Sequence, residues 1–306
     1  MNKDLLRMDN LSKDEILDIL NLADQLKYER KHGIEHPILK GKSLGMIFEK
    51  ASTRTRVSFE VGMYQLGGHP LFLSSKDLQI GRGEAIQDTA RVLSRYLDGI
   101  MIRTFSQEEV ETLAECSSIP IINGLTDEEH PCQVLADLMT IRENKLILEG
   151  LKVAYIGDGN NMCNSLIIGC LTLGIHISIA NPLGYKPPKY YIEKGKALAI
   201  KNSVSFEMTE DPKVAIKDAD VIITDVWASM GQESETKKRQ IAFKGYQVNS
   251  EIMKLANDDA IVLHCLPAHR GEEITVEIIE AHANVIFEEA ENRLHAQKAI
   301  LVKLLS

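Results

Sequence analysis

The segment Ser52-Thr-Arg-Thr-Arg56 places three hydroxyls and two guanidiniums within five residues. It follows a short apolar run, residues 43–48, and precedes Val57, Val61 and Tyr64, which recur at helical spacing. The first N–H groups of a helix lack helical partners and the helix dipole makes that end positive, so this polar turn is suited to binding a phosphate. A simple N-cap with solvated arginines is the commoner use of a Ser/Thr-Arg turn. Five consecutive polar residues after a buried strand favour the anion site.

Polar residues also stand at the ends of other predicted strands. Arg103 ends the apolar run 99–103, and His130-Pro-Cys-Gln133 follows the run 119–123; Asp225 and Cys265 end two later runs. Taken singly, each has a simple structural explanation: a His-Pro helix start, an Asp cap or an inert buried thiol. Ligands of parallel α/β sheets bind beyond the carboxyl ends of the strands, however. Their shared position therefore predicts a functional site.

Strands and helices of similar length alternate along the chain, which predicts parallel sheets covered by helices on both faces. A capping box, Ser12-Lys-Asp-Glu15, begins a helix that ends near Gly33, and Glu149-Gly150 marks a boundary between two halves. Helices are also expected over 88–97 and 134–142. The expected strands are residues 43–48, 70–74, 99–103, 119–123, 152–156, 174–180, 204–208, 221–225, 260–265 and 285–287.

The turn Gly157-Asp-Gly-Asn-Asn-Met162 resembles a dinucleotide-binding loop, but two features argue against that function. Met162 stands where the third glycine of the fingerprint belongs. The next strand ends in Ala180-Asn-Pro, without the acidic residue that binds a ribose. A nicotinamide-dependent dehydrogenase is therefore disfavoured, and the paired asparagines suit a ligand with both donors and acceptors.

Composition limits the remaining classes of function. The 306 residues carry a net charge of -9, which argues against nucleic acid as a partner. The sequence shows no apolar run of membrane-spanning length and no signal-peptide pattern at its start, so we expect no membrane association. Five cysteines without a C-x-x-C pair indicate reduced thiols in a cytoplasmic protein rather than a disulfide framework.

Taken together, the polar motifs closely resemble the aspartate/ornithine carbamoyltransferase family, and the match runs from end to end of the chain. The first three motifs are shared across that family, whereas Ser229-Met-Gly231 and the His-Cys-Leu-Pro motif are typical of its ornithine-specific branch. The motifs are Ser52-Thr-Arg-Thr-Arg56, Arg103, His130-Pro-Cys-Gln133, Asp158-Gly-Asn-Asn161, Asp225-Val-Trp-Ala-Ser-Met-Gly231, His264-Cys-Leu-Pro267 and Glu289-Ala-Glu-Asn-Arg293.

The resemblance implies an α/β protein of two domains, each a parallel sheet flanked by helices. Residues 1–133 would bind carbamoyl phosphate, with the C-terminal helix, 290–306, returning to this domain, and residues 134–289 would bind ornithine. The implied reaction transfers the carbamoyl group to ornithine, giving citrulline and phosphate, with no metal and no organic cofactor. It belongs to arginine metabolism, and the sequence leaves its physiological direction open.

The family's carbamoyl phosphate residues can be placed on this sequence. Ser52, Thr53, Arg54 and Thr55 would hold the phosphate at the helix N-terminus. The carbamoyl group would be surrounded by Thr55, Arg103, His130 and Gln133, and Arg293 would lie beside the carbamoyl phosphate. Arg103 and His130 would be catalytic, because donors fixed around the carbonyl oxygen stabilise the charge that develops there.

The ornithine residues implied by the resemblance lie in the second half. Asn161 would bind the carboxylate end, and Asp225 with Ser229 the α-amino group, with Met230 contributing through its backbone. Cys265 and Leu266 would complete this site. Cys265 and Asp225 are both candidates for orienting or deprotonating the attacking amine, and the sequence does not rank them.

The polar segment 75–84 has a further role in the family, where it reaches into a neighbouring subunit's site. Gln79 would make that contact and join the carbamoyl phosphate residues. The resemblance therefore implies a homotrimer or a multiple of trimers.

Two alternative functions remain: an enzyme of the same family with another substrate, and a protein of another functional class. A carbamoyltransferase for another amine, such as putrescine or N-acetylornithine, would share the phosphate site. Asp225 and Ser229-Met-Gly231 favour a free α-amino acid, because an acetylated nitrogen would not need the carboxylate. A non-catalytic binding module is disfavoured by the complete set of motifs.

Overall fold

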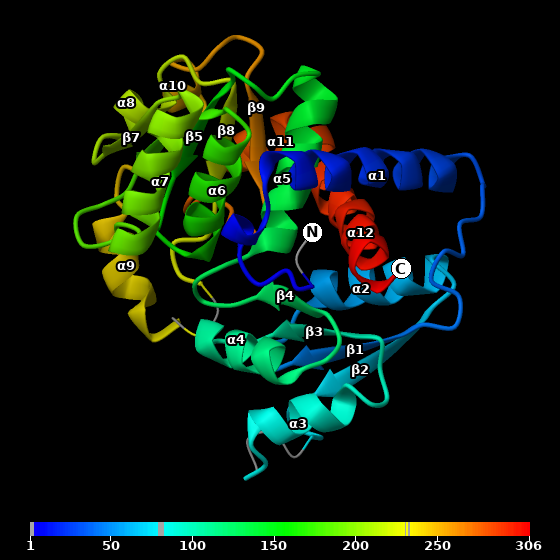
Figure 1. The fold of residues 1–306 in the computed structure, drawn as a ribbon. Helices are drawn as coiled ribbons and strands as arrows, with labels where there is room; N and C mark the ends of the chain where they lie inside the picture. Colours follow the sequence, from blue (N-terminus) through cyan, green and yellow to red (C-terminus); the bar gives the residue numbers. More distant parts are fainter. Residues whose placement is uncertain (1–2, 79–82, 230, 232) are drawn as a thin grey trace. The chain divides into compact units, whose positions relative to one another are not determined.

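The computed structural model describes residues 3–78, 83–229, 231 and 233–306 (Figure 1). The chain divides into two compact units: unit 1 is Met1–Met139 with Asn292–Ser306, and unit 2 is Thr140–Glu291. Helices α5 (Pro131–Lys145) and α12 (Ala283–Leu305) contribute residues to both. The predicted return of the C-terminal helix to the first part of the chain is confirmed.

Unit 1 contains, among the described residues, a four-stranded parallel sheet in the order β2-β1-β3-β4. Its core strands are almost continuously buried, as expected for a parallel sheet covered on both faces. The strands are β1 (Ser43–Phe48), β2 (His69–Ser74), β3 (Gly99–Arg103) and β4 (Ile121–Leu125). The helices are η1 (Met8–Asn10), α1 (Lys13–Lys31), α2 (Thr53–Gln65), α3 (Ile86–Leu93) and α4 (Gln107–Cys116).

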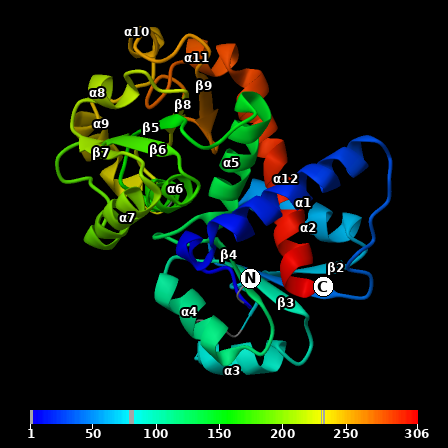
Figure 2. The same ribbon diagram turned by 45° about the horizontal axis from the view of Figure 1, so that its top comes forward.

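Helices α3 and α4 cover one face of the unit 1 sheet, and α2 and α12 lie on the other (Figures 1 and 2). The α3–α4 face packs Ile100 and Ile102 of β3 against Ala90 and Val110. On the opposite face α2 and α12 approach closely at Gly62, where an added Cβ would lie 3.2 Å from Cγ of Lys298. This close approach places side chains of α12 beside the C-terminal half of α2.

Unit 2 contains, within the described ranges, a five-stranded parallel sheet in the order β7-β6-β5-β8-β9. A hydrophobic core cluster joins this sheet to α8, α10 and α11. The strands are β5 (Lys152–Ile156), β6 (His176–Ala180), β7 (Phe206–Thr209), β8 (Val221–Thr224) and β9 (Ile261–His264). The helices are α6 (Asn161–Thr172), α7 (Lys189–Asn202), α8 (Pro212–Ile216), η2 (Glu233–Glu235), α9 (Thr236–Ala242), α10 (Ser250–Met253) and α11 (Val276–Ala281).

The register of β8 and β9 decides where two of the predicted site residues lie. Thr224 pairs with His264 as the last pair of the ladder. The next residues, Asp225 and Cys265, therefore leave the sheet side by side at its carboxyl edge. Arg103 likewise is the last residue of β3 in unit 1.

One predicted strand is wrong. Residues 285–287 lie in the first turns of α12 rather than in a strand. Burial recurs there at Ile286, Glu289 and Arg293, which is helical spacing. A three-residue apolar run cannot reveal this period, because it is shorter than one helical turn.

The five cysteines are free thiols in the structure, and Cys132, Cys163 and Cys170 are buried. Burial raises the pKa of the Cys132 thiol to about 12, so it stays protonated. Among the described residues, every helix falls short of the combined length and apolarity needed to cross a membrane.

Candidate active site

The polar turn after β1 is a capped helix start. Ser52 is the N-cap of α2, and its side chain accepts a hydrogen bond from the N–H of Thr55 at 3.2 Å. The two arginines of the turn differ in their surroundings. Arg56 is bound to Glu60 at 3.1 Å and lies over the ring of Phe72, 3.7 Å from its centroid. Arg54, which is half-buried, is therefore the better candidate for binding an anion.

Arg293 of α12 connects three of the predicted site residues in unit 1. Its Nη2 donates to Oγ1 of Thr55 at 2.7 Å, and its Nη1 donates to Oε1 of Gln133 at 2.7 Å. The same Nη1 lies 3.4 Å from Nε2 of His130. A guanidinium can only donate, so this contact makes Nε2 the acceptor and leaves the proton on Nδ1. One buried side chain thus gathers residues from α2, α5 and the segment before α5.

His130 is a neutral imidazole in a positively charged pocket. Burial, and then the charges of Arg293, Arg103 and Arg54, hold its pKa well below the ordinary value of 6.5. Each of these guanidiniums disfavours a second positive charge close by. The pocket is therefore suited to an anion, with a neutral hydrogen-bond donor at its centre.

The loop between β1 and α2 is fixed to the ends of β3 and β4. The N–H of Glu49 donates to the carbonyl of Arg103 at 2.9 Å, and the buried Lys50 forms an ion pair with Asp127. The hydroxyl of Thr104 contacts the carboxyl groups of both Glu49 and Glu109. Because one hydroxyl carries one proton, it can donate to only one of these carboxyl groups at a time.

Glu109→Gln is expected to stabilise the protein at alkaline pH. Burial, with the nearby charge of Glu49, raises the pKa of Glu109 above its ordinary value of 4.5. A carboxyl group whose pKa is raised by folding stabilises the folded state at pH values below its ordinary pKa. This contribution is lost as the pH rises through the folded-state pKa. The variant should therefore have a higher urea midpoint than the wild type at pH 8 and a similar one at pH 4.

The matched control for this prediction is Glu108→Gln, which removes an exposed carboxylate from the same first turn of α4. It corrects for any interaction with the helix dipole. An equal gain at both pH values would mean that ionisation of Glu109 is not the cause.

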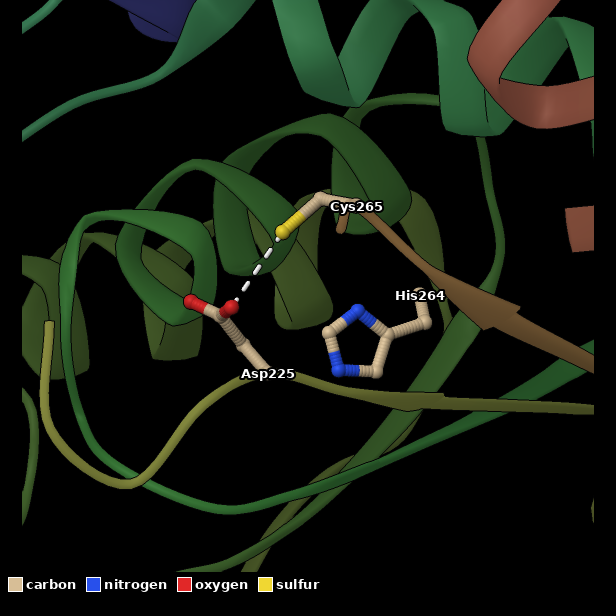
Figure 3. Close-up of side chains that lie close together, drawn as sticks. All are labelled: Asp225, His264 and Cys265. Carbon is tan, nitrogen blue, oxygen red and sulfur yellow. Dashed lines mark hydrogen bonds between the residues drawn. The ribbon is translucent and has the colours of Figure 1, made fainter. Parts of the chain in front are cut away.

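In unit 2, three donors converge on Asp225. Its Oδ1 accepts from the N–H of Val226 at 2.8 Å and from the thiol of Cys265 at 3.2 Å. Its Oδ2 accepts from Nδ2 of Asn160 at 2.8 Å. Figure 3 shows the thiol pointing at the carboxylate from the end of β9. The carboxylate is buried and held in one orientation.

His264 lies beside this pair but is hydrogen-bonded to the backbone of its own loop. Its Nδ1 accepts from the N–H of Leu266 at 2.9 Å, which leaves Nε2 to donate to the buried Glu273 at 2.9 Å. One ligand atom each from Asp225, His264 and Cys265 lie within 4.8 Å of one another, as in a metal site (Figure 3). Both imidazole nitrogens are engaged, however, so the arrangement does not present three metal ligands.

Asp158 of the glycine-rich turn is a structural residue. Nη1 of Arg239 donates to its Oδ2 at 2.6 Å and to the carbonyl of Trp227 at 2.8 Å. The guanidinium thereby joins the loop after β5 to the loop after β8. Burial raises the pKa of Asp158 despite this opposite charge.

The remaining predicted residues of unit 2 lie around the same edge of the sheet. Asn161 is the first residue of α6, and Ser229 follows β8. Leu266 has a φ of 56°, a left-handed conformation that is uncommon for a residue other than glycine. Gln79 and Met230 lie outside the described residues.

Several residues at these sites were given no individual role from the sequence, although Asn160 was noted as one of the paired asparagines. Asn160 is the N-cap of α6, accepting from the N–H groups of Met162 and Cys163, and it orients Asp225. Asn is a preferred N-cap, so the start of α6 was the available signal. Arg239 and Asp137, a buried partner of Gln133, carry no comparable local signal.

The chain matches two family models: Aspartate/ornithine carbamoyltransferase, carbamoyl-P binding domain, over residues 3–143, and Aspartate/ornithine carbamoyltransferase, Asp/Orn binding domain, over residues 149–304. It is 57% identical over 304 residues to an ornithine carbamoyltransferase of Oceanobacillus iheyensis, covering 99% of this chain and 94% of the relative. A relative of the same name from Carboxydothermus hydrogenoformans is 56% identical over 303 residues, covering 99% and 97%.

Solved structures agree with these matches. The ornithine carbamoyltransferase of Pyrococcus furiosus superposes with a TM-score of 0.96 at 51% identity, over 99% of this chain and 96% of that one. Sequence and fold therefore agree over nearly the whole length. The chain belongs to the aspartate/ornithine carbamoyltransferase family.

Proposed function

We propose that the protein transfers the carbamoyl group of carbamoyl phosphate to the side-chain amine of L-ornithine, forming L-citrulline and phosphate. The observation that carries this proposal is the convergence of Arg54, Arg103 and Arg293 on the neutral His130 in unit 1. This pocket suits a small acyl phosphate with a polar acyl group. The full-length relatives named ornithine carbamoyltransferase support ornithine as the acceptor.

Carbamoyl phosphate would bind in unit 1. Its phosphate would lie at the N-terminus of α2, held by Arg54, the hydroxyls of Ser52, Thr53 and Thr55, and free helical N–H groups. Helix N-termini and guanidiniums together form a strong phosphate site because both supply oriented donors and positive charge.

The carbamoyl group would lie among Arg103, His130, Gln133 and Arg293. As the amine attacks, the carbonyl oxygen gains negative charge, and Arg103 with the Nδ1–H of His130 would donate to it. The low pKa of His130 keeps this donor neutral at physiological pH. Donors already in place need little reorganisation during the reaction, and one of them typically contributes a rate factor of about a hundred or more.

Ornithine would bind in unit 2 at the edge formed by β8 and β9. Asp225 and Ser229 would bind the α-ammonium, with the backbone of Met230. Asn161 would bind the α-carboxylate at the first turn of α6, where the helix dipole is favourable. The side-chain amine would lie toward Cys265 and Leu266.

The chemical step exchanges one bond at the carbamoyl carbon for another. The lone pair of the amine forms the new C–N bond, and the C–O bond to phosphate breaks with its electrons leaving on the phosphate. The ammonium must lose one proton before attack and the product nitrogen a second afterwards. Cys265 and Asp225, joined by a hydrogen bond, are the groups proposed to orient the amine or take the first proton.

A direct assay tests this function. Purified protein is given carbamoyl phosphate with ornithine, putrescine, N-acetylornithine or aspartate in parallel, and the carbamoylated product is measured. A clear preference for ornithine supports the proposal. Preference for another amine would keep the phosphate site and overturn the ornithine site, and no turnover with any amine would favour a binding module.

We further propose that the protein is a homotrimer or a multiple of trimers. Helix α2 exposes Val57, Val61 and Tyr64 at 52%, 37% and 77%, on a single stripe at helical spacing. Such a stripe favours an interface with another subunit. By resemblance to the family, Gln79 would reach a neighbour's carbamoyl phosphate site.

Tyr64→Glu is expected to shift the protein toward smaller species, because a carboxylate in a subunit interface is left without solvent. Sedimentation velocity measures the change. Ile200→Glu is the matched control, since Ile200 is 82% exposed on α7 of unit 2. A monomeric wild type, or equal effects of both variants, would contradict an interface at α2.

A cytoplasmic location is proposed from the cysteines. All five are free thiols, as expected in a reducing compartment. The net charge of -9 gives no support to a nucleic-acid partner, so the partners proposed are the two substrates and further copies of the chain.

A further inference from the structure

The amide of Gln133 is hydrogen-bonded at both ends inside unit 1. Its Oε1 accepts from Nη1 of Arg293 at 2.7 Å, and its Nε2 donates to Oδ1 of Asp137 at 2.8 Å. Gln133 and Asp137 are fully buried, and both belong to α5, where a spacing of four residues places them on one face. The sequence motif ended at Gln133, so Asp137 has no role in the function proposed above.

These two partners leave the amide only one orientation. A guanidinium carries donors only, and a carboxylate carries acceptors only. If the amide were rotated by half a turn, its NH2 group would face Arg293 and its carbonyl would face Asp137, so both contacts would become repulsive. The usual ambiguity between the oxygen and nitrogen of a glutamine side chain is therefore resolved by its neighbours.

The orientation directs an acceptor toward the charged pocket. Oε1 lies on the side of Arg293, which also contacts Thr55 and His130. A carbonyl oxygen has two lone pairs, so Oε1 can accept from Arg293 and from one further donor. The arginines of the pocket carry donors only, so this oxygen adds an amide acceptor beside them.

We propose that Asp137 is a positioning residue that fixes the Gln133 amide with its oxygen toward the substrate, and so selects an acyl phosphate with a terminal NH2 group. The inference rests on the proposed function. Carbamoyl phosphate carries that NH2 group, whereas acetyl phosphate has a methyl group of similar size in its place. A site built to accept from an NH group rejects the analogue that lacks it, because its buried acceptor then loses a partner.

The test compares the binding of carbamoyl phosphate, acetyl phosphate and inorganic phosphate to the whole protein by calorimetry. The wild type should prefer carbamoyl phosphate to acetyl phosphate by about tenfold to a hundredfold, as expected for one hydrogen bond in a buried site. Asp137→Asn keeps the size of the side chain but can donate as well as accept, so Arg293 alone then opposes the reversed orientation of Gln133. The preference should then fall about tenfold, with the affinity for inorganic phosphate unchanged.

A second variant and a double mutant test whether Asp137 orients the Gln133 amide or only supports the fold. Asp137→Ser, whose hydroxyl can also donate or accept, should cause the same loss of preference without added volume. Gln133→Ala should lose the preference, and adding Asp137→Asn to it should have no further effect, because Asp137 acts through Gln133.

The outcomes distinguish this inference from the proposed function. A wild type that binds carbamoyl phosphate no better than inorganic phosphate would overturn the proposed function itself. A wild-type preference that survives in both Asp137 variants would overturn the inference alone. A parallel loss of all three ligands in those variants would also contradict it, since Asp137 would then support the whole pocket rather than one amide.

Discussion

Arg54→Ala is expected to weaken the binding of carbamoyl phosphate by about a hundredfold to a thousandfold. Arg54 lies in the first turn of α2, and its charge acts on His130 within the buried pocket. A charge-assisted hydrogen bond contributes about 1.5–3 kcal/mol, and a guanidinium that binds phosphate through two such bonds contributes more. The helical N–H groups and the hydroxyl of Ser52 would remain, so the helix should stay capped.

The chain supplies its own control for this prediction in Arg56→Ala. Both changes remove one guanidinium from the same turn, but Arg56 is engaged by Glu60 and Phe72. Calorimetry with carbamoyl phosphate should therefore separate the two variants by at least about tenfold. Similar losses in both would show that the turn attracts the phosphate through its net charge alone and that Arg54 makes no specific contact.

The ends of parallel strands were the most predictable part of the site. A buried apolar run that stops at a charged or reactive residue is visible in a single sequence, as at Arg103, Asp225 and Cys265. The structure places these residues at or directly after the ends of β3, β8 and β9. The fold class followed from the same runs, because their alternation with helices leaves few arrangements other than parallel sheets.

The contacts between side chains were not predictable in this way. Arg293 is 238 residues from Thr55 and 160 residues from Gln133 along the chain, yet it binds both. No local pattern encodes such a pairing, and Arg293 was included only because its motif resembles the family. Asp158 and Arg239 are a second case, 81 residues apart.

Neighbouring asparagines show a subtler limit. Asn160 and Asn161 have the same chemistry, and the sequence does not say which of them begins α6. The structure makes Asn160 the N-cap and therefore the partner of Asp225, while Asn161 begins the helix proper. A difference of one residue in a helix boundary thus decides which of the two amides orients the carboxylate.

Asp225→Asn is expected to raise the KM for ornithine by about a hundredfold and to change the affinity for carbamoyl phosphate little. The variant keeps the shape of the side chain and an oxygen for the N–H of Val226, so the loop after β8 should persist. It loses the negative charge that would bind the α-ammonium, and a hydrogen bond to a charged group contributes about 1.5–3 kcal/mol. Steady-state kinetics with each substrate varied in turn measures both effects.

Asp220→Asn is the matched control, because Asp220 lies directly before β8 and Asp225 directly after it. Asp220 binds Asn257 and the N–H of Lys152 at the opposite edge of the sheet, so its loss should leave the KM for ornithine unchanged.

Equal losses for both substrates in Asp225→Asn would mean that the two binding sites are assigned to the wrong units. A fall in kcat with an unchanged KM would instead place Asp225 at the reacting amine, because an interaction made only in the transition state affects kcat and not ground-state binding. Asp225 contacts both Cys265 and Asn160, and these contacts are compatible with either role. Measuring KM and kcat separately therefore distinguishes binding of the α-ammonium from action on the side-chain amine.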